Sequence, residues 1–138
     1  MKEQSAKSKM LFLVFGSILW LLIIPIKLFR FINFNVIEII NNNGASFLGS
    51  SGLLFMILGS RSRLSTLALS QATIITIIVA LSIEFFQLLF RFEDSSSSLY
   101  RFDILDIYAT ILGIIIAYTL SRCIIRHYNK FVNESNFD

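Results

Sequence analysis

The sequence predicts an all-α fold, an integral membrane bundle of four transmembrane helices. The chain of 138 residues is 55% hydrophobic and 15% charged, whereas a soluble domain usually holds about 45–50% apolar and about 25% charged residues. Long uncharged stretches recur along the chain, and lysines and arginines stand at their ends. With one proline, six glycines and no linker-like segment, residues 1–138 are expected to form a single transmembrane domain.

The first two spans differ in character. Met10–Ile26 carries no charge and is long enough for about 25 Å of helix, so it predicts a first span that is not cleaved. Phe31–Ile40 is interrupted by polar residues and favours an interfacial stretch, and Asn41–Gly44 predicts a turn. The second span, about Ala45–Ser60, begins with small residues that allow helices to pack closely in lipid.

The third and fourth spans are predicted to be antiparallel neighbours. Leu64–Ile83 is uncharged, and Glu84 and a further apolar stretch follow it as far as Phe90. The hydrophilic loop Arg91–Tyr100 follows, and then Ile104–Leu120 forms the fourth span ahead of a polar tail. Because the connecting loop is short, the end of the third helix should lie beside the start of the fourth.

The positions of the positive charges predict the orientation, since lysines and arginines accumulate on the cytoplasmic side of a membrane protein. A multi-pass protein of the cell membrane with both termini in the cytoplasm is expected. No basic stripe suits nucleic acid, so membrane lipids are the expected surroundings. In this orientation the inner residues are Lys2, Lys7, Lys9, Arg61, Arg63, Arg122, Arg126 and Lys130, and the outer ones are Lys27, Arg30, Arg91 and Arg101.

Two stripes of small and polar residues are predicted on the facing sides of the third and fourth spans. Steps of three and four residues place each stripe on one helix face. The outer end of each stripe is ionisable, so the two outer ends should form one polar pocket. The stripes are Ser70, Thr73, Ile77, Ala80, Glu84, Gln87 and Arg91 on the third span, and Asp103, Asp106, Thr110, Gly113 and Ala117 on the fourth.

Glu84 favours a functional interpretation most strongly. A carboxylate in hydrocarbon costs on the order of a few kcal/mol unless it is paired, protonated or near water. Arg91 or Arg101 is expected to bridge it to the aspartates. Structural explanations stay open beside this one. Asp103 and Asp106 suit the N-cap and first turn of a helix, and Glu84 suits an interfacial ion pair with Arg91.

The small residues of the fourth span predict close helix packing, and the single cysteine and single histidine exclude several kinds of site. Gly113 and Ala117 belong to a small-xxx-small pattern, and Gly113 is expected where the third and fourth helices approach most closely. One cysteine and one histidine exclude a disulfide framework, a paired-thiol zinc site and histidine-based triads. No metal or cofactor is expected.

The order of these residues resembles the VanZ-like family. That family's signature is Glu-x-x-Gln near the end of one transmembrane helix, followed after a short outer loop by Arg, Asp-x-x-Asp, and Asn and Gly on the next helix. The chain departs from the pattern in the spacing of its arginine, in threonine for asparagine, and in alanine for a second glycine. The resemblance covers about 82–118, with matches at Glu84, Gln87, Arg101, Asp103, Asp106 and Gly113.

The resemblance implies action at the outer face of a bacterial membrane, because the family's founding member confers low-level teicoplanin resistance. The expected function is an envelope protein, not necessarily an enzyme, that binds a cell-wall precursor, an amphiphilic antibiotic or another lipid-linked molecule. Two alternatives stay open. One is a membrane enzyme that uses Glu84, Asp103 and Asp106 as acid/base groups or divalent-cation ligands. The other is a small proton-coupled transporter. The expected ligand-binding residues are Glu84, Gln87, Arg91, Arg101, Asp103, Asp106 and Thr110.

Overall fold

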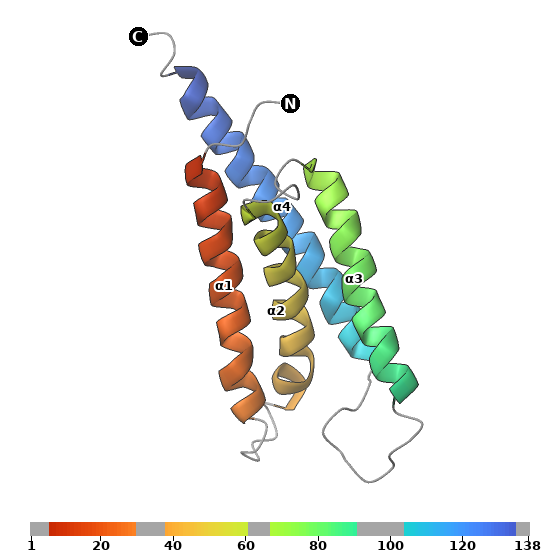
Figure 1. Ribbon diagram of the computed structural model, residues 1–138. Coiled ribbons are helices and arrows are strands. Elements are labelled where there is room, and N and C mark those ends of the chain that lie inside the picture. Colours follow the sequence, from red (N-terminus) through yellow and green to blue (C-terminus); the bar gives the residue numbers. More distant parts are fainter. Residues whose placement is uncertain (1–5, 30–37, 61–66, 91–103, 135–138) are drawn as a thin grey trace.

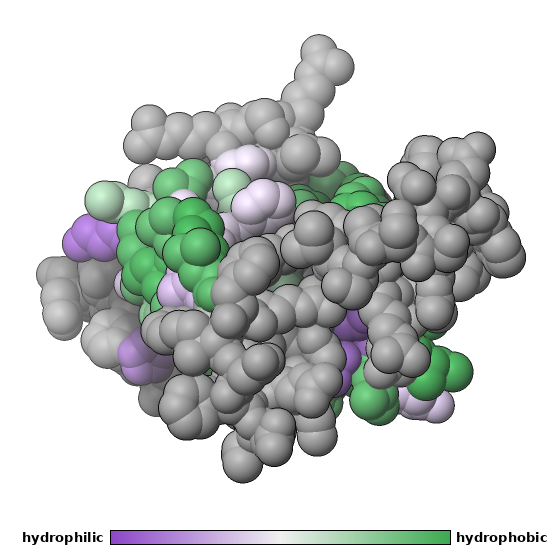
Figure 2. Space-filling view, turned by 90° about the horizontal axis from the view of Figure 1, so that it is seen from below, coloured by the Kyte–Doolittle hydropathy of each residue, from purple (hydrophilic) through white to green (hydrophobic). Residues whose placement is uncertain are grey.

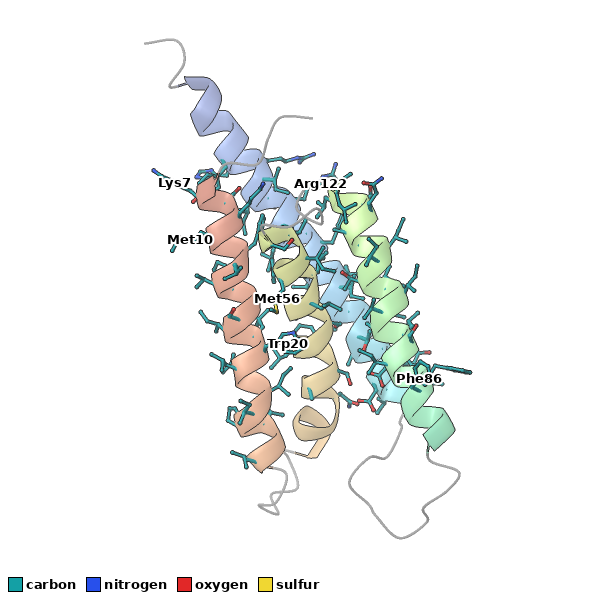
Figure 3. The ribbon with its side chains drawn as sticks, in the orientation of Figure 1. Lys7, Met10, Trp20, Met56, Phe86 and Arg122 are labelled. Atoms are coloured by element: carbon teal, nitrogen blue, oxygen red, sulfur yellow. The ribbon has the colours of Figure 1, made fainter. Side chains whose placement is uncertain are left out.

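The computed structural model describes residues 6–29, 38–60, 67–90 and 104–134. These ranges form the helices α1 (Ala6–Phe29), α2 (Glu38–Gly59), α3 (Leu69–Phe90) and α4 (Ile104–Glu134). The helices run alternately in opposite directions, so α1 begins and α4 ends at the same end of the bundle (Figure 1). Lys7 and Arg122 lie at this basic end, whereas Phe86 lies towards the opposite end (Figure 3).

The described part of the chain contains three helical segments that are long and apolar enough to cross a membrane: Lys7–Ile26, Leu69–Phe86 and Ile104–Tyr128. The apolar segment of α2, Asn43–Gly59, is shorter. Large apolar side chains cover the outside of the helices, as at Leu21, which is 63% exposed. An exposed apolar surface of this extent is unfavourable in water. The all-helical fold and its apolar exterior are therefore compatible with a membrane protein.

The apolar core lies in the half of the bundle nearer the basic end. Its members come from all four helices, and Phe12 stacks on Phe55 with ring centroids 6.0 Å apart. Helix α2 occupies the centre, because it packs on α1, α3 and α4, whereas α1 packs mainly on α2 (Figure 1). The buried core residues are Phe12, Leu54, Phe55, Ile57, Leu58, Ala72 and Ala117.

The start of α3 is determined by a local hydrogen bond. The backbone N–H of Ala68 donates to Gln71 Oε1 at 2.9 Å, and the Ala72 N–H donates to the Ala68 carbonyl at 3.0 Å. A glutamine three residues after the N-cap thus satisfies a backbone N–H that the helix itself leaves free. The helix therefore begins at Leu69 and not at Leu64, where the third span was predicted to start, although Leu64 itself lies outside the described residues.

Two further boundaries differ from the prediction. Asn41–Gly44 is not a turn, because α2 begins at Glu38 and runs through these residues. Asparagine and glycine disfavour helix only weakly, and packing of the following turns on α1 and α4 outweighs that preference. Helix α4 continues past Leu120 to Glu134, well into the predicted polar tail. No proline or glycine interrupts this extension, so polarity alone does not end the helix.

Candidate functional site

Glu84 is the buried carboxylate of α3. Its side chain is only 6% exposed, and Oε1 accepts a hydrogen bond from the Thr110 hydroxyl of α4 at 3.4 Å. Thr110 is itself 1% exposed. Burial of a carboxylate requires hydrogen-bond partners or other compensation. Helix α3 thus turns Glu84 towards its neighbours and away from the apolar exterior.

Asp106 lies one helical turn before Thr110, in the first turn of α4. It is 7% exposed, and its Oδ1 accepts a hydrogen bond from the Ser46 hydroxyl of α2 at 3.3 Å. The charge of Asp106 and the hydroxyl of Ser46 also lie close enough to act on Glu84. The two carboxylates therefore belong to one site between three helices, at the end opposite Lys7 and Arg122. We call this the acidic end.

Ser50 completes the polar network one turn further along α2. Its hydroxyl donates to the Thr110 backbone carbonyl and to the Phe47 carbonyl, both at 3.1 Å. A hydroxyl that bonds to a backbone carbonyl of a neighbouring helix holds the two helices in a defined register. We refer to Ser46, Ser50, Glu84, Asp106 and Thr110 as the polar cluster.

Two acceptor atoms at the acidic end have no hydrogen-bond partner within the described part of the chain. They are Glu84 Oε2 and Asn43 Oδ1, and both atoms are buried. Asn43 stands one turn before Ser46, on the same side of α2. A buried polar atom without a partner costs about 1–3 kcal/mol. Buried polar atoms without a partner are rare in native proteins, so the polar cluster is the principal candidate site.

The fourth-span stripe forms a buried face, as its spacing predicts. Asp106, Thr110 and Ala117 are each at most 7% exposed, and Gly113 is buried with them. The predicted partner of Gly113 is wrong, however. A Cβ atom built on Gly113 would stand 2.5 Å from the Phe47 carbonyl oxygen and 2.8 Å from Ser50 Oγ, both on α2. Gly113 therefore lies at the contact of α4 with α2 and not with α3.

The predicted stripe of the third span is buried only towards the acidic end. Ala80 and Glu84 are buried, but Ser70 and Ile77 are exposed. The buried row instead runs through Ala72, Thr76, Ala80 and Glu84 at steps of four. Residues four apart form one ridge on the surface of a helix, and on α3 this ridge packs against the neighbouring helices.

The remaining predicted site residues lie partly or wholly outside the part of the chain that the structure describes. Gln87 belongs to α3, but its side chain lies outside the described residues. Arg91, Arg101 and Asp103 lie outside them altogether, so the predicted arginine bridge stays a prediction.

The sequence interpretation missed the part that α2 plays in the site. It treated Ser46 and Ser50 only as small packing residues. Their spacing of four places both hydroxyls on one helix face, and that was the signal available in the sequence.

The chemistry of the polar cluster is that of a hydrogen-bond acceptor. Within the described ranges, no group of three or more His, Cys, Asp or Glu side chains is placed to hold a metal ion. Two carboxylates from different helices can accept donors from a positively charged or hydroxyl-rich group, or can exchange a proton with it. Figure 2 shows the acidic end, where both hydrophilic and hydrophobic residues reach the surface.

Comparison with known proteins adds no identification to this geometry. No family model, no curated protein and no solved structure matches the chain.

Proposed function

We propose that the chain is a VanZ-like protein of the bacterial cell membrane, and that its polar cluster binds a lipid-linked or amphiphilic molecule at the outer face. In this proposal all four helices cross the bilayer, both termini are cytoplasmic, and the acidic end faces outward. Binding of a cell-wall precursor or of an amphiphilic antibiotic would contribute to glycopeptide resistance.

One observation carries the proposal: the buried Oε2 of Glu84 has no hydrogen-bond partner among the described residues. A carboxylate that served only to join α3 to α4 would be expected to have both oxygens satisfied, because an unsatisfied buried acceptor destabilises the fold. The sequence resemblance places Glu84 and Asp106 in its signature, and the structure brings these two residues into one site.

The orientation draws support from the charges at the two ends. Lys7, Lys9, Arg122 and Arg126 lie on the first turns of α1 or the later turns of α4, hence at the basic end. Positive charges favour the cytoplasmic side, so the polar cluster would face outward. The apolar segment of α2 spans about 25 Å as a helix, which is near the thickness of a thin bilayer.

Antibiotic susceptibility tests this function. Deletion of the gene should increase teicoplanin susceptibility, and wild-type protein should restore resistance. Glu84→Ala should accumulate in the membrane without restoring it. Ser82→Ala is the matched control, because Ser82 is exposed on the same helix and its hydroxyl donates to the Ile78 carbonyl of that helix at 2.7 Å. Full rescue by Glu84→Ala would overturn the proposal.

A membrane enzyme is the second candidate, favoured by the convergence of two carboxylates from α3 and α4. General acid–base chemistry needs two such groups within reach of one substrate. Under this alternative, Glu84→Gln and Asp106→Asn would abolish resistance yet still bind the amphiphile. Under simple binding, resistance and binding would be lost together.

A further inference from the structure

The polar cluster contains more hydrogen-bond acceptors than donors. Each hydroxyl has one proton, and all three protons are already used: Thr110 donates to Glu84, Ser46 to Asp106, and Ser50 to backbone carbonyls. Glu84 Oε2 and Asn43 Oδ1 remain as buried acceptors without donors among the described residues. Among the described residues, the buried Oε2 of Glu84 therefore lacks a donor.

The buried Oε2 of Glu84 accepts no hydrogen bond from any described residue. A group that brings its own N–H donors would satisfy it.

The two carboxylates of the polar cluster favour a ligand with a positive charge. Two carboxylates belong to the site, so a phosphate or carboxylate ligand would meet like charges there. A divalent cation usually takes six or more oxygen ligands, often from several carboxylates. The described side chains provide no group of three metal-ligating residues. A primary ammonium needs only two or three acceptors, and each charge-assisted bond is stronger than a neutral one.

The surroundings of the cluster point to a membrane-borne ligand. Close to Glu84 on the outside of α3, Ile83, Phe85 and Phe86 are each more than half exposed. An alkyl chain can pack on these side chains while its head group reaches the carboxylates. Helix α3 also has the smallest packing contact with the rest of the bundle, so its junction with α2 and α4 is the side that separates most readily.

We propose that the polar cluster binds an amphiphile whose head group carries a primary ammonium, with its N–H donors on Glu84 Oε2 and on the acceptors beside it. This inference rests on the proposed function and deepens it, because it names the chemical class of the ligand. A quaternary ammonium is the informative comparison, since it keeps the positive charge but has no N–H donor.

The test uses the full chain, purified into nanodiscs of phosphatidylcholine, whose head group has no N–H donor. Thermal unfolding is followed while dodecylammonium, dodecyltrimethylammonium, dodecyl phosphate or methylammonium is added, because a ligand of the folded state raises the unfolding temperature. Dodecylammonium should bind at least about tenfold more tightly than dodecyltrimethylammonium, the ratio expected from loss of one charge-assisted hydrogen bond. Glu84→Gln should lose this preference and Ser82→Ala should keep it.

The other outcomes separate the inference from the proposed function. Equal binding of the two ammonium amphiphiles to wild type, or tighter Glu84-dependent binding of dodecyl phosphate, would overturn the ammonium inference and leave the proposed function standing. Absence of any Glu84-dependent amphiphile binding would overturn both. If methylammonium bound as tightly as dodecylammonium, the alkyl chain would contribute nothing to binding. That result would overturn the inference that the ligand comes from the membrane. The wild-type comparison of the two head groups needs no variant, so it holds even if Glu84→Gln fails to fold.

Discussion

Thr110 of α4 donates its hydroxyl proton to Glu84 of α3 at 3.4 Å, while Ser50 of α2 donates to the backbone carbonyl of Thr110 at 3.1 Å. One residue of α4 therefore connects both neighbouring helices at the acidic end. A substitution of the Thr110 side chain removes the bond to Glu84 but keeps the backbone carbonyl that accepts from Ser50. Thr110 is therefore suitable for the first experiment.

Thr110→Val should destabilise the protein, because valine keeps the shape of threonine but leaves Oε1 of Glu84 without its donor. Loss of a partner for a buried acceptor costs about 1–3 kcal/mol. Thr110→Ser should be much milder, since serine retains the hydroxyl. Thermal unfolding in a neutral detergent measures both. Thr119→Val is the control, because Thr119 is exposed and its hydroxyl donates to the Ile115 carbonyl of its own helix. Equal melting temperatures for the valine variants at 110 and 119 would contradict the bond to Glu84.

Gly113→Ala should lower stability, because the new Cβ would stand 2.5 Å from the Phe47 carbonyl oxygen. That atom belongs to the backbone, so relief requires α2 and α4 to move apart. Overpacking of this kind typically costs about 1–3 kcal/mol. Gly49→Ala is the matched control, since its Cβ would meet only Ile23 Cδ1 at 3.8 Å. The control variant should be neutral or slightly more stable, because alanine favours helix over glycine. An equally stable Gly113→Ala protein would rule out the close contact of α2 with α4.

Gly52→Ala should perturb the contact between α1 and α2. Its Cβ would stand 2.5 Å from Trp20 Cδ1 and 3.2 Å from the Gly16 carbonyl oxygen. Trp20→Leu removes the first of these obstacles, so the double variant should lose less stability than the sum of the two single variants. A double-mutant cycle measures this coupling, which for residues in contact is about 0.5–3 kcal/mol. Strictly additive effects would show that Trp20 does not pack on Gly52.

Topology reporters test the orientation. A reporter fused after Asn133 should report the cytoplasm, and one inserted at Ser96 should report the outside. The reason is that α4 runs from the acidic end to the basic end, and the positive charges at the basic end favour the cytoplasmic side (Figure 1). Reporters on the same side of the membrane would contradict both the orientation and a spanning α4.

A sequence by itself determines which residues of one helix share a face. The row Asp106, Thr110, Gly113 and Ala117 is buried as predicted, because helical periodicity depends only on spacing within one segment. For Glu84 the sequence predicted a position facing the fourth span, with an interfacial ion pair as the alternative, and the side chain is buried. The all-helical fold also follows from local properties, namely long apolar runs with few helix breakers.

Only the tertiary structure decides which helix each face meets. Gly113 packs on Phe47 of α2, although chain order suggested α3, because spacing within one helix carries no information about its partner. Likewise Ser46 enters the site only because α2 occupies the centre of the bundle and brings its hydroxyl to Asp106. The displaced row on α3 has the same origin, since the placement of α2 and α4, and not the spacing within α3, decides which of its residues become buried.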